Sequence, residues 1–201
     1  MSNSSNPALI LASTSQIRKQ ILLQAGLNFS SEAPKLDEEK LKQALAPIAP
    51  HKLAARLSEL KSLSLCESHP KSLILGADQT LSLNGKLFNK PANLDEARQH
   101  LETLRGQTHT LHSSLTISQN GNVIWQYSED ANLTMRQFSN QYLKNYLNYS
   151  GNEILSSVGA YKLEHSGIQL FERIEGDYFT ILGLPLLPLL AFLRQQKQIM
   201  A

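Results

Sequence analysis

Short hydroxyl residues and a basic residue stand where an apolar run gives way to a helical pattern near the start of the chain. Ser13 and Ser15 follow the apolar run at 8–12, and Arg18 comes one helical turn later. Free N–H groups and the dipole at a helix start attract phosphate, and an arginine can bind a phosphate through two donors. The segment therefore predicts phosphate binding by these three residues. The alternative is ordinary helix capping by Ser15, with Arg18 in solvent.

A second candidate is Asp78, at the carboxyl end of the strand predicted at 72–77. Ligand crevices of α/β proteins open at such strand ends. A carboxylate there can bind Mg²⁺ or accept a proton from an attacking water. The alternative is that Asp78 only forms a turn or caps a helix.

Two further segments carry charged residues beside proline or glycine. Pro91 restrains Lys90 to an extended position from which its ammonium could bind a phosphate, and a lysine solvated in a loop is the alternative. Farther along, glycines and aromatic residues accompany Glu164, Glu175 and Asp177, which are candidate metal ligands or base readers. The alternative for the last of these is a tight turn.

Several common catalytic patterns are missing from the sequence. It contains neither a Walker A sequence nor GxGxxG, and zinc-ligand spacing is absent. His109 and His112 are three residues apart in a predicted strand, which directs them to opposite faces, so we do not expect this pair to bind a metal. The single cysteine, Cys66, is interpreted as a packing residue because no histidine stands in a recognisable partner motif.

Helices and strands alternate along the chain, and these elements must position the candidate residues. The apolar runs at 8–12 and 72–77 are typical of strands buried on both faces. Asn84-Gly85 and Asn120-Gly121 predict two β-hairpins. Helices are predicted at about 17–25, 51–65, 93–104, 140–147 and from Pro185, and further strands at 29–33, 169–171 and 178–181. The class is therefore α/β with a mixed sheet.

Charge and composition limit the partners of this chain. Its 201 residues carry a net charge of only +2, which gives no sign of the basic face that a nucleic-acid binder needs. No apolar run approaches the ~20 residues that span a membrane, and the polar start without Lys or Arg is not a secretory signal. We expect a cytoplasmic protein without nucleic-acid or membrane partners, with one domain over 8–195 and a flexible segment at 1–7.

Taken together, these segments resemble the Maf family of nucleotide pyrophosphatases, also called septum formation inhibitor proteins. The resemblance extends from about Leu9 to Leu193. One such segment is weak evidence, whereas their shared order and spacing are highly specific. In the family's order they are Leu9–Ser15, Asp37-Glu38, Gly76-Ala77-Asp78, Lys90-Pro91, Gly106–His109, Val158–Tyr161, Ile174–Tyr178 and Gly183–Leu186.

The resemblance implies an elongated mixed sheet with flanking helices, and two lobes around a central nucleotide-binding cleft. It implies hydrolysis of a nucleoside triphosphate at the α–β bond, giving nucleoside monophosphate and pyrophosphate, with Mg²⁺ or Mn²⁺ as cofactor. Family members are usually cytoplasmic and often homodimers. The implied roles are proton acceptor for Asp78, phosphate binding for Ser13, Ser15, Arg18, Lys61 and Lys90, metal binding for Glu38 and Asp78, and base recognition for Glu164 and Gln79.

The sequence departs from the family's usual pattern at three places. Gln16-Ile17-Arg18 replaces Pro-Arg-Arg, Gln79 replaces the common Thr, and Glu164 replaces the Gln typical of members acting on thymidine and uridine triphosphates. These features resemble the subgroup acting on 7-methyl-GTP. A carboxylate can accept hydrogen bonds from both N1–H and the exocyclic amine of guanine, whereas uracil and thymine present a mixed edge that suits an amide. We therefore expect Glu164 to read a guanine-type base.

Two functions of other classes are alternatives. A nucleotide-binding regulator of cell division without significant turnover could use the same pocket, because phosphate binding needs basic groups but no general base. A nucleic-acid binder is the second alternative, and the balanced charge counts against it.

Overall fold

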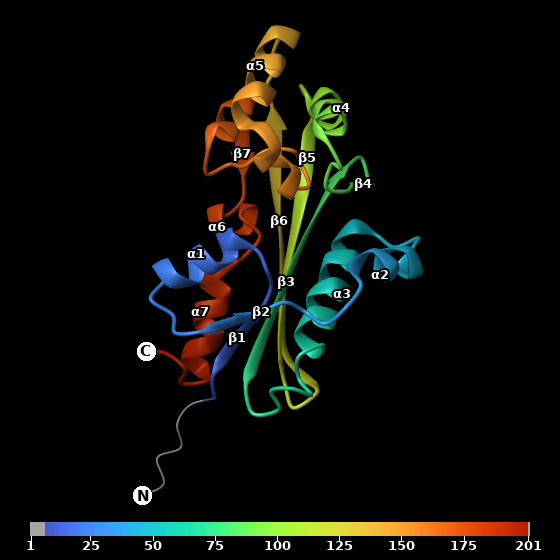
Figure 1. The fold of residues 1–201 in the computed structure, drawn as a ribbon. Coiled ribbons are helices and arrows are strands. Elements are labelled where there is room, and N and C mark those ends of the chain that lie inside the picture. The colour runs from blue at the N-terminus through green and yellow to red at the C-terminus, as the bar shows by residue number, and fades with distance from the viewer. Residues whose placement is uncertain (1–6, 201) are drawn as a thin grey trace, which may run out of the picture. The chain divides into compact units, whose positions relative to one another are not determined.

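Seven strands form one mixed sheet in the computed structural model, which describes residues 7–200 (Figure 1). They are β1 (Leu9–Ala12), β2 (Ser30–Glu32), β3 (Leu73–Leu83), β4 (Lys86–Phe88), β5 (Thr108–Gln119), β6 (Asn122–Met135) and β7 (Phe171–Glu175). The order is β2-β1-β3-β5-β6-β7, and β4 pairs with β3 outside this path. Strand β1 is parallel to β2 and β3, whereas the β3–β4 and β6–β7 pairs are antiparallel. The predicted α/β class is confirmed, and the segment predicted to be flexible, except Pro7, lies outside the described residues.

Helices connect these strands, and side chains cap several of their starts. They are α1 (Gln16–Gln24), α2 (Glu38–Leu45), α3 (Pro50–Leu63), α4 (Leu94–Leu104), α5 (Asn140–Ser150), α6 (Tyr178–Ile181), α7 (Leu186–Gln195) and the 3₁₀ helices η1 (Gly151–Ser156) and η2 (Ser166–Leu170). The N-caps Ser15, Asp37, Asn93 and Ser139 each accept a hydrogen bond from the backbone N–H three residues on. Between residues 7 and 200, no helix combines the length and apolar character needed to cross a membrane.

The chain divides into two compact units. The first unit contains the residues up to Gln79, Ser113–Glu129 and the residues from Tyr178 onward, and the second contains Thr80–His112 and Asp130–Asp177. Strands β3, β5 and β6 contribute residues to both units. The candidate residues Lys90, Glu164, Glu175 and Asp177 belong to the second unit, and the other predicted site residues belong to the first.

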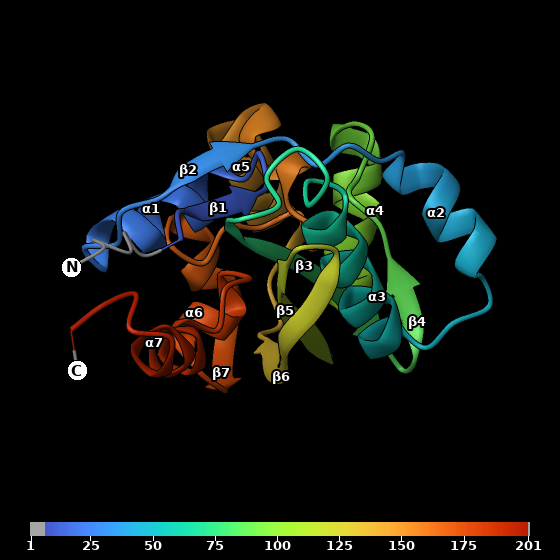
Figure 2. The same ribbon diagram turned by 90° about the horizontal axis from the view of Figure 1, so that it is seen from below.

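The first unit buries apolar residues on both faces of β1. Leu9 and Leu11 join a core that includes side chains from α1, α7, β3 and β5, whereas Ile10 and Ala12 belong to a smaller cluster that includes Cys66. This alternation follows the period of a strand, and it confirms Cys66 as a packing residue. Figure 2 shows α3 and α7 on opposite sides of the strands of this unit.

The segment predicted as a strand at 178–181 is the short helix α6. Its Tyr-Phe-Thr-Ile sequence favours a strand locally, but Gly183 ends a helix here in the left-handed region at φ +82°. Gly183 N–H donates to Thr180 O at 3.0 Å and Leu184 N–H donates to Phe179 O at 2.9 Å, which is the Schellman pattern of a helix end. The strand prediction was wrong because this cap outweighs the β propensity of the segment.

Strand β3 is longer than predicted, and this changes the setting of Asp78. The predicted strand at 72–77 and the first arm of the Asn84-Gly85 hairpin form one strand of 11 residues, so Asp78 lies inside β3 and not at its end. Its parallel neighbour β1 ends at Ala12, opposite Gly76. Asp78 therefore lies just past the carboxyl end of the parallel pair, where the sheet continues without β1.

A buried histidine lies in the core of the second unit. His109 is 1% exposed, and its Nε2 lies 2.7 Å from the hydroxyl of Tyr161. Both rings pack against Phe171, and His109 Nδ1 has no hydrogen-bond partner among the described residues. Burial lowers the pKa of His109 to about 4, so the ring is neutral at neutral pH.

We expect His109 to make the free energy of unfolding depend on pH. In an unfolded chain the histidine pKa is ~6.5, whereas in the folded protein it is about 4. The unfolded state therefore binds more protons between these two pH values. The contribution of His109 to the free energy of unfolding is complete above pH ~6.5, and it falls by about 3 kcal/mol as the pH drops through the folded pKa.

Urea denaturation of the wild type and of His109→Gln across this pH range measures the effect. The wild type should lose stability toward acid more steeply than the variant, because glutamine does not titrate. Equal slopes for the two proteins would contradict the assignment to His109.

Candidate active site

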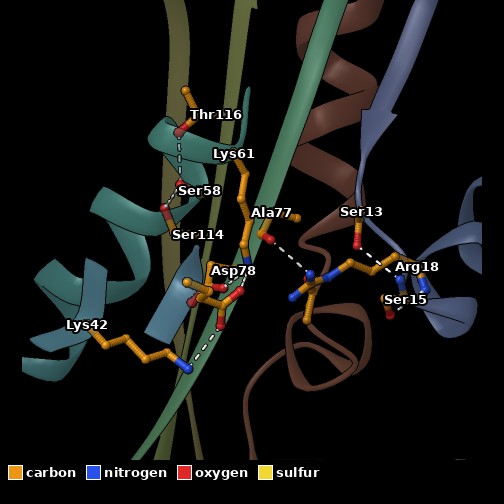
Figure 3. Close-up of polar contacts among 12 residues, drawn as sticks. Ser13, Ser15, Arg18, Lys42, Ser58, Lys61, Ala77, Asp78, Ser114 and Thr116 are labelled. Atoms are coloured by element: carbon orange, nitrogen blue, oxygen red, sulfur yellow. Dashed lines mark hydrogen bonds and ion pairs between the residues drawn. The ribbon is translucent and has the colours of Figure 1, made fainter. Parts of the chain in front are cut away.

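A buried ion pair joins α3 to β3. Lys61 Nζ lies 2.5 Å from Asp78 Oδ1 and 2.8 Å from Glu38 Oε2, so one ammonium bridges two carboxylates (Figure 3). The side chains of Lys61 and Asp78 are only 9% and 8% exposed. Lys61 shares the buried face of α3 with Leu57 and Ser58, which precede it at helical spacing. The fold thus holds a buried cation directly against the predicted proton acceptor.

The electrostatic environment of Asp78 suits a proton acceptor. Burial is the largest influence and raises the pKa of Asp78, Lys61 and Arg18 act in the opposite direction, and Glu38 adds to the rise. A carboxylate with a raised pKa is a stronger base. Lys61 binds Oδ1, and Oδ2 makes no hydrogen bond within residues 7–200, so Oδ2 is the oxygen available to a water or a metal.

Glu38 begins α2, directly after the N-cap Asp37. Burial alone would raise its pKa, but Lys61 and Lys42 together outweigh burial and lower the pKa of Glu38 to about 2. Lys42 Nζ lies 3.0 Å from Glu38 Oε1, one helical turn along α2. Sequence reasoning missed both α2 and Lys42. The Glu–Lys spacing of four residues is the signal that could have revealed them.

Backbone carbonyls hold the guanidinium of Arg18. Its Nε donates to Gly183 O at 2.9 Å and its Nη1 donates to Ala77 O at 2.8 Å (Figure 3). Burial lowers the pKa of Arg18, against the influence of Asp78 and Glu38, but an arginine keeps its charge because its ordinary pKa is above ~12. The alternative of a solvated Arg18 was wrong, and this cation is tied to the residue that precedes Asp78.

Ser13 and Ser15 lie at the start of α1. Ser15 is its N-cap and accepts a hydrogen bond from Arg18 N–H at 3.5 Å, while Ser15 N–H donates to Ser13 Oγ at 3.2 Å. Ser13 is buried and Ser15 is half-buried. Capping by Ser15 is therefore real, and phosphate binding by the two serines stays a prediction.

Gln79 is bound to α6 and β5. Its Nε2 lies 2.9 Å from Ser113 Oγ, 3.1 Å from Thr180 O and 3.0 Å from Ile181 O. These contacts occupy both N–H bonds of the amide, so only Oε1 is left for a base. Base recognition by Gln79 stays a prediction, and it would have to use the amide oxygen Oε1.

The remaining candidates lie in the second unit. Lys90 is exposed just after β4, and the following Pro91 is buried. Glu164 is half-buried in the turn that precedes η2. Glu175 pairs with Arg173 at 2.7 Å on exposed β7. A part for Lys90 and Glu164 in the site of Asp78 is a prediction from the family resemblance.

The carboxylates of the first unit fit a hard divalent cation bound together with nucleotide. No cluster of three or more His, Cys, Asp or Glu residues that could hold a metal ion occurs in the described part of the chain. Glu38 and Asp78 approach the same ammonium instead. Mg²⁺ is commonly held by one or two carboxylates plus substrate phosphates, and this pair of oxygen donors suits that arrangement.

A serine–histidine–aspartate chain crosses three strands of the second unit. Ser82 Oγ lies 2.9 Å from His112 Nε2, and His112 Nδ1 lies 2.8 Å from Asp130 Oδ1. A nucleophilic serine must reach substrate, yet Ser82 is 7% exposed and the side chain of Asp130 is 54% exposed. In a catalytic triad the serine is accessible and the aspartate is buried, which is the opposite of this arrangement. The three side chains therefore form a contact between neighbouring strands.

Comparison with known proteins gives one consistent result. A family model described as Maf-like protein matches residues 8–196. A nucleoside triphosphate pyrophosphatase of Caulobacter vibrioides is 47% identical over 186 residues, which cover 92% of this chain and 93% of that protein. The 7-methyl-GTP pyrophosphatases of Rhizobium meliloti and Rhizobium johnstonii are 44% and 46% identical over 191 residues, which cover 94% of this chain and 96% of each relative. The predicted resemblance is confirmed.

Proposed function

This chain belongs to the Maf-like protein family, and we propose that it hydrolyses nucleoside triphosphates to nucleoside monophosphate and pyrophosphate. The observation that carries the proposal is a buried carboxylate, Asp78, paired with Lys61 and influenced by the charge of Arg18. A triphosphate needs cations to bind, and its hydrolysis needs a base for the attacking water. The names of the relatives agree with this chemistry. A cytoplasmic homodimer is proposed on the family resemblance alone.

Asp78 orients the attacking water and takes its proton. The water oxygen forms a bond to phosphorus while the bond between that phosphorus and the oxygen bridging the α- and β-phosphates breaks. Pyrophosphate leaves with the electron pair, and the proton passes to Asp78 Oδ2. Arg18, Lys61 and Lys90 stabilise the phosphate charge as it shifts, and Ser13 and Ser15 donate hydrogen bonds to the phosphates.

We assign the metal to Glu38 and Asp78. Mg²⁺ or Mn²⁺ bound there supplies positive charge that neutralises the phosphates. The low pKa of Glu38, about 2, keeps its carboxylate ionised and ready to bind a cation across the physiological range. Lys61 holds the two carboxylates near one another through its contacts with both.

We assign base recognition to Glu164 and favour a 7-methyl-GTP-like substrate. A carboxylate accepts both hydrogen bonds that the guanine edge donates. Methylation at N7 gives the guanine ring a positive charge, so a nearby carboxylate also favours the modified base by charge. Two of the relatives described above carry the name 7-methyl-GTP pyrophosphatase.

We expect Glu164→Gln to weaken guanine substrates selectively. An amide can accept only one of the two hydrogen bonds and carries no charge, so kcat/KM for 7-methyl-GTP and GTP should fall about 10- to 100-fold. The values for UTP and dTTP should stay level or rise. The matched control is Glu172→Gln, which changes an exposed acid of the same unit. Equal losses for all bases would argue against base reading by Glu164.

Pyrophosphate release tests the activity itself. The standard ribo- and deoxynucleoside triphosphates and 7-methyl-GTP are compared with Mg²⁺ or Mn²⁺ present. Release from a guanine-type substrate supports the proposal. Nucleotide binding without release from any of them would favour the regulatory alternative.

A further inference from the structure

Helix α3 rests directly on strand β3 at a glycine. Gly76 is buried and lies two residues before Asp78. A Cβ added at Gly76 would collide with the carbonyl oxygen of Ser58 and would lie 2.7 Å from the backbone N of Ser62. Both of these atoms belong to the backbone of α3. No side chain fits at position 76 unless the helix moves away from the strand.

Hydroxyl groups fill the adjoining contact between α3 and β5. Ser58 and Ser62 each donate to a carbonyl of their own helix, so their oxygens act as acceptors toward β5. The hydroxyls of β5 recur at every second residue, which places them on one face of the strand. The paired oxygens are Ser58–Ser114 at 3.1 Å, Ser58–Thr116 at 2.9 Å and Ser62–Ser118 at 2.7 Å.

Lys61 extends from the same face of α3. It lies between Ser58 and Ser62 in the sequence, and all three are buried. Figure 3 shows Ser58 directed toward Ser114 and Thr116, while Lys61 is directed toward Asp78. The close contact at Gly76 and the ion pair of Asp78 thus involve the same helix turn and two nearby positions of β3.

We propose that Gly76 and Ser58 are positioning residues: Gly76 sets the separation of α3 from β3, Ser58 sets that of α3 from β5, and together they place Lys61 against Asp78. The inference rests on the proposed function, because placement matters there if Lys61 stabilises phosphate charge beside the base. A lysine is flexible, so a helix held farther away would let its ammonium occupy several positions. A displacement of ~1 Å in a catalytic group can cost about 100-fold in rate. The size of the residue at 58, and not its hydroxyl, is what matters for this role.

Variants that change the side-chain size at positions 76 and 58 distinguish displacement of Lys61 from a general loss of stability. Gly76→Ala enlarges the contact of α3 with β3, and Ser58→Val enlarges the contact of α3 with β5. Ser58→Ala removes the hydroxyl and keeps the contact with β5 small. One readout is the NMR signal of the Lys61 ammonium in protein labelled with ¹⁵N-lysine, identified by its loss in Lys61→Met. The other readout is kcat and KM for pyrophosphate release from 7-methyl-GTP with Mg²⁺.

Enlarging the contact should alter or abolish the Lys61 signal and lower kcat about 10- to 100-fold, with a smaller change in KM. Ser58→Ala should keep the wild-type signal and a kcat within about twofold, although its melting temperature falls. Leu189→Ala is the control for lost stability, because Leu189 lies on α7 in the apolar core of the first unit. This variant should also keep the wild-type Lys61 signal and kcat. If Gly76→Ala does not fold, Ser58→Val carries the test.

Two outcomes overturn the inference. One is a wild-type Lys61 signal and kcat in Ser58→Val. The other is an equal loss in Leu189→Ala, which would show that stability alone is responsible. A wild type that releases no pyrophosphate but shows the expected changes in the Lys61 signal would refute the proposed function and support the positioning role.

Discussion

Asp78→Asn should lower turnover by about 10³-fold or more while nucleotide binding persists. Asparagine keeps the shape of the side chain but neither accepts a proton from water nor carries the charge that a metal needs. Together, the loss of a general base and of a metal ligand should lower kcat on the order of 10³-fold or more. Arg18 is held by Ala77 O and Gly183 O, so we expect this cation to stay in place for the phosphates in the variant. Pyrophosphate release and calorimetric titration with nucleotide measure the two effects.

The matched control for this change is Asp95→Asn. Asp95 is an exposed acid in the first turn of α4, and it undergoes the same chemical change. Its kcat should stay near that of the wild type. A folded Asp78→Asn protein with near wild-type turnover would remove Asp78 from the reaction and require another base.

The sequence predicted the elements whose local signals agree with their surroundings. Asn93 is the N-cap of α4, the helix predicted at 93–104. The turns at Asn84-Gly85 and Asn120-Gly121 have the positive φ angles that the predicted hairpins need. Prediction failed where a contact with a distant part of the chain determines the local structure. The segment 178–181 has β propensity, yet Thr180 is fully buried and its Oγ1 donates to Glu129 Oε2 on β6. No local pattern contains that partner.

The same distinction applies to the candidate site. Asp78 and Arg18 were derived from their positions beside predicted strands and helices. Lys61 entered only through the family resemblance, because a lysine in an amphipathic helix ordinarily lies in solvent. Its burial depends on Gly76, 15 positions later in the sequence, and on the β5 hydroxyls that face α3. Those contacts exist only after the helix and the sheet have packed.

Lys61→Met should lower the free energy of unfolding by about 3–5 kcal/mol, because it leaves a buried carboxylate without its partner. The Asp78 side chain is only 8% exposed, and its Oδ1 has Lys61 as its ion-pair partner. Methionine fills similar space without charge, so the loss is electrostatic. Combining Lys61→Met with Asp78→Asn should recover much of the stability, since the buried charge is then removed. Urea denaturation of the single and double variants at neutral pH measures this coupling.

Lys40→Met is the control, because it breaks an ion pair with Asp37 in which the lysine side chain is 85% exposed. It should change the free energy of unfolding by less than about 1 kcal/mol. Equal losses in the two lysine variants would contradict a buried pair at Asp78.

Mg²⁺ should stabilise the Lys61→Met variant if Glu38 and Asp78 bind a divalent cation, because the ion can take the place of the missing ammonium. Mg²⁺ should then stabilise Lys61→Met more than the wild type, since any ligand that binds the folded state raises its stability. Equal stabilisation of both proteins would argue against a metal at these carboxylates.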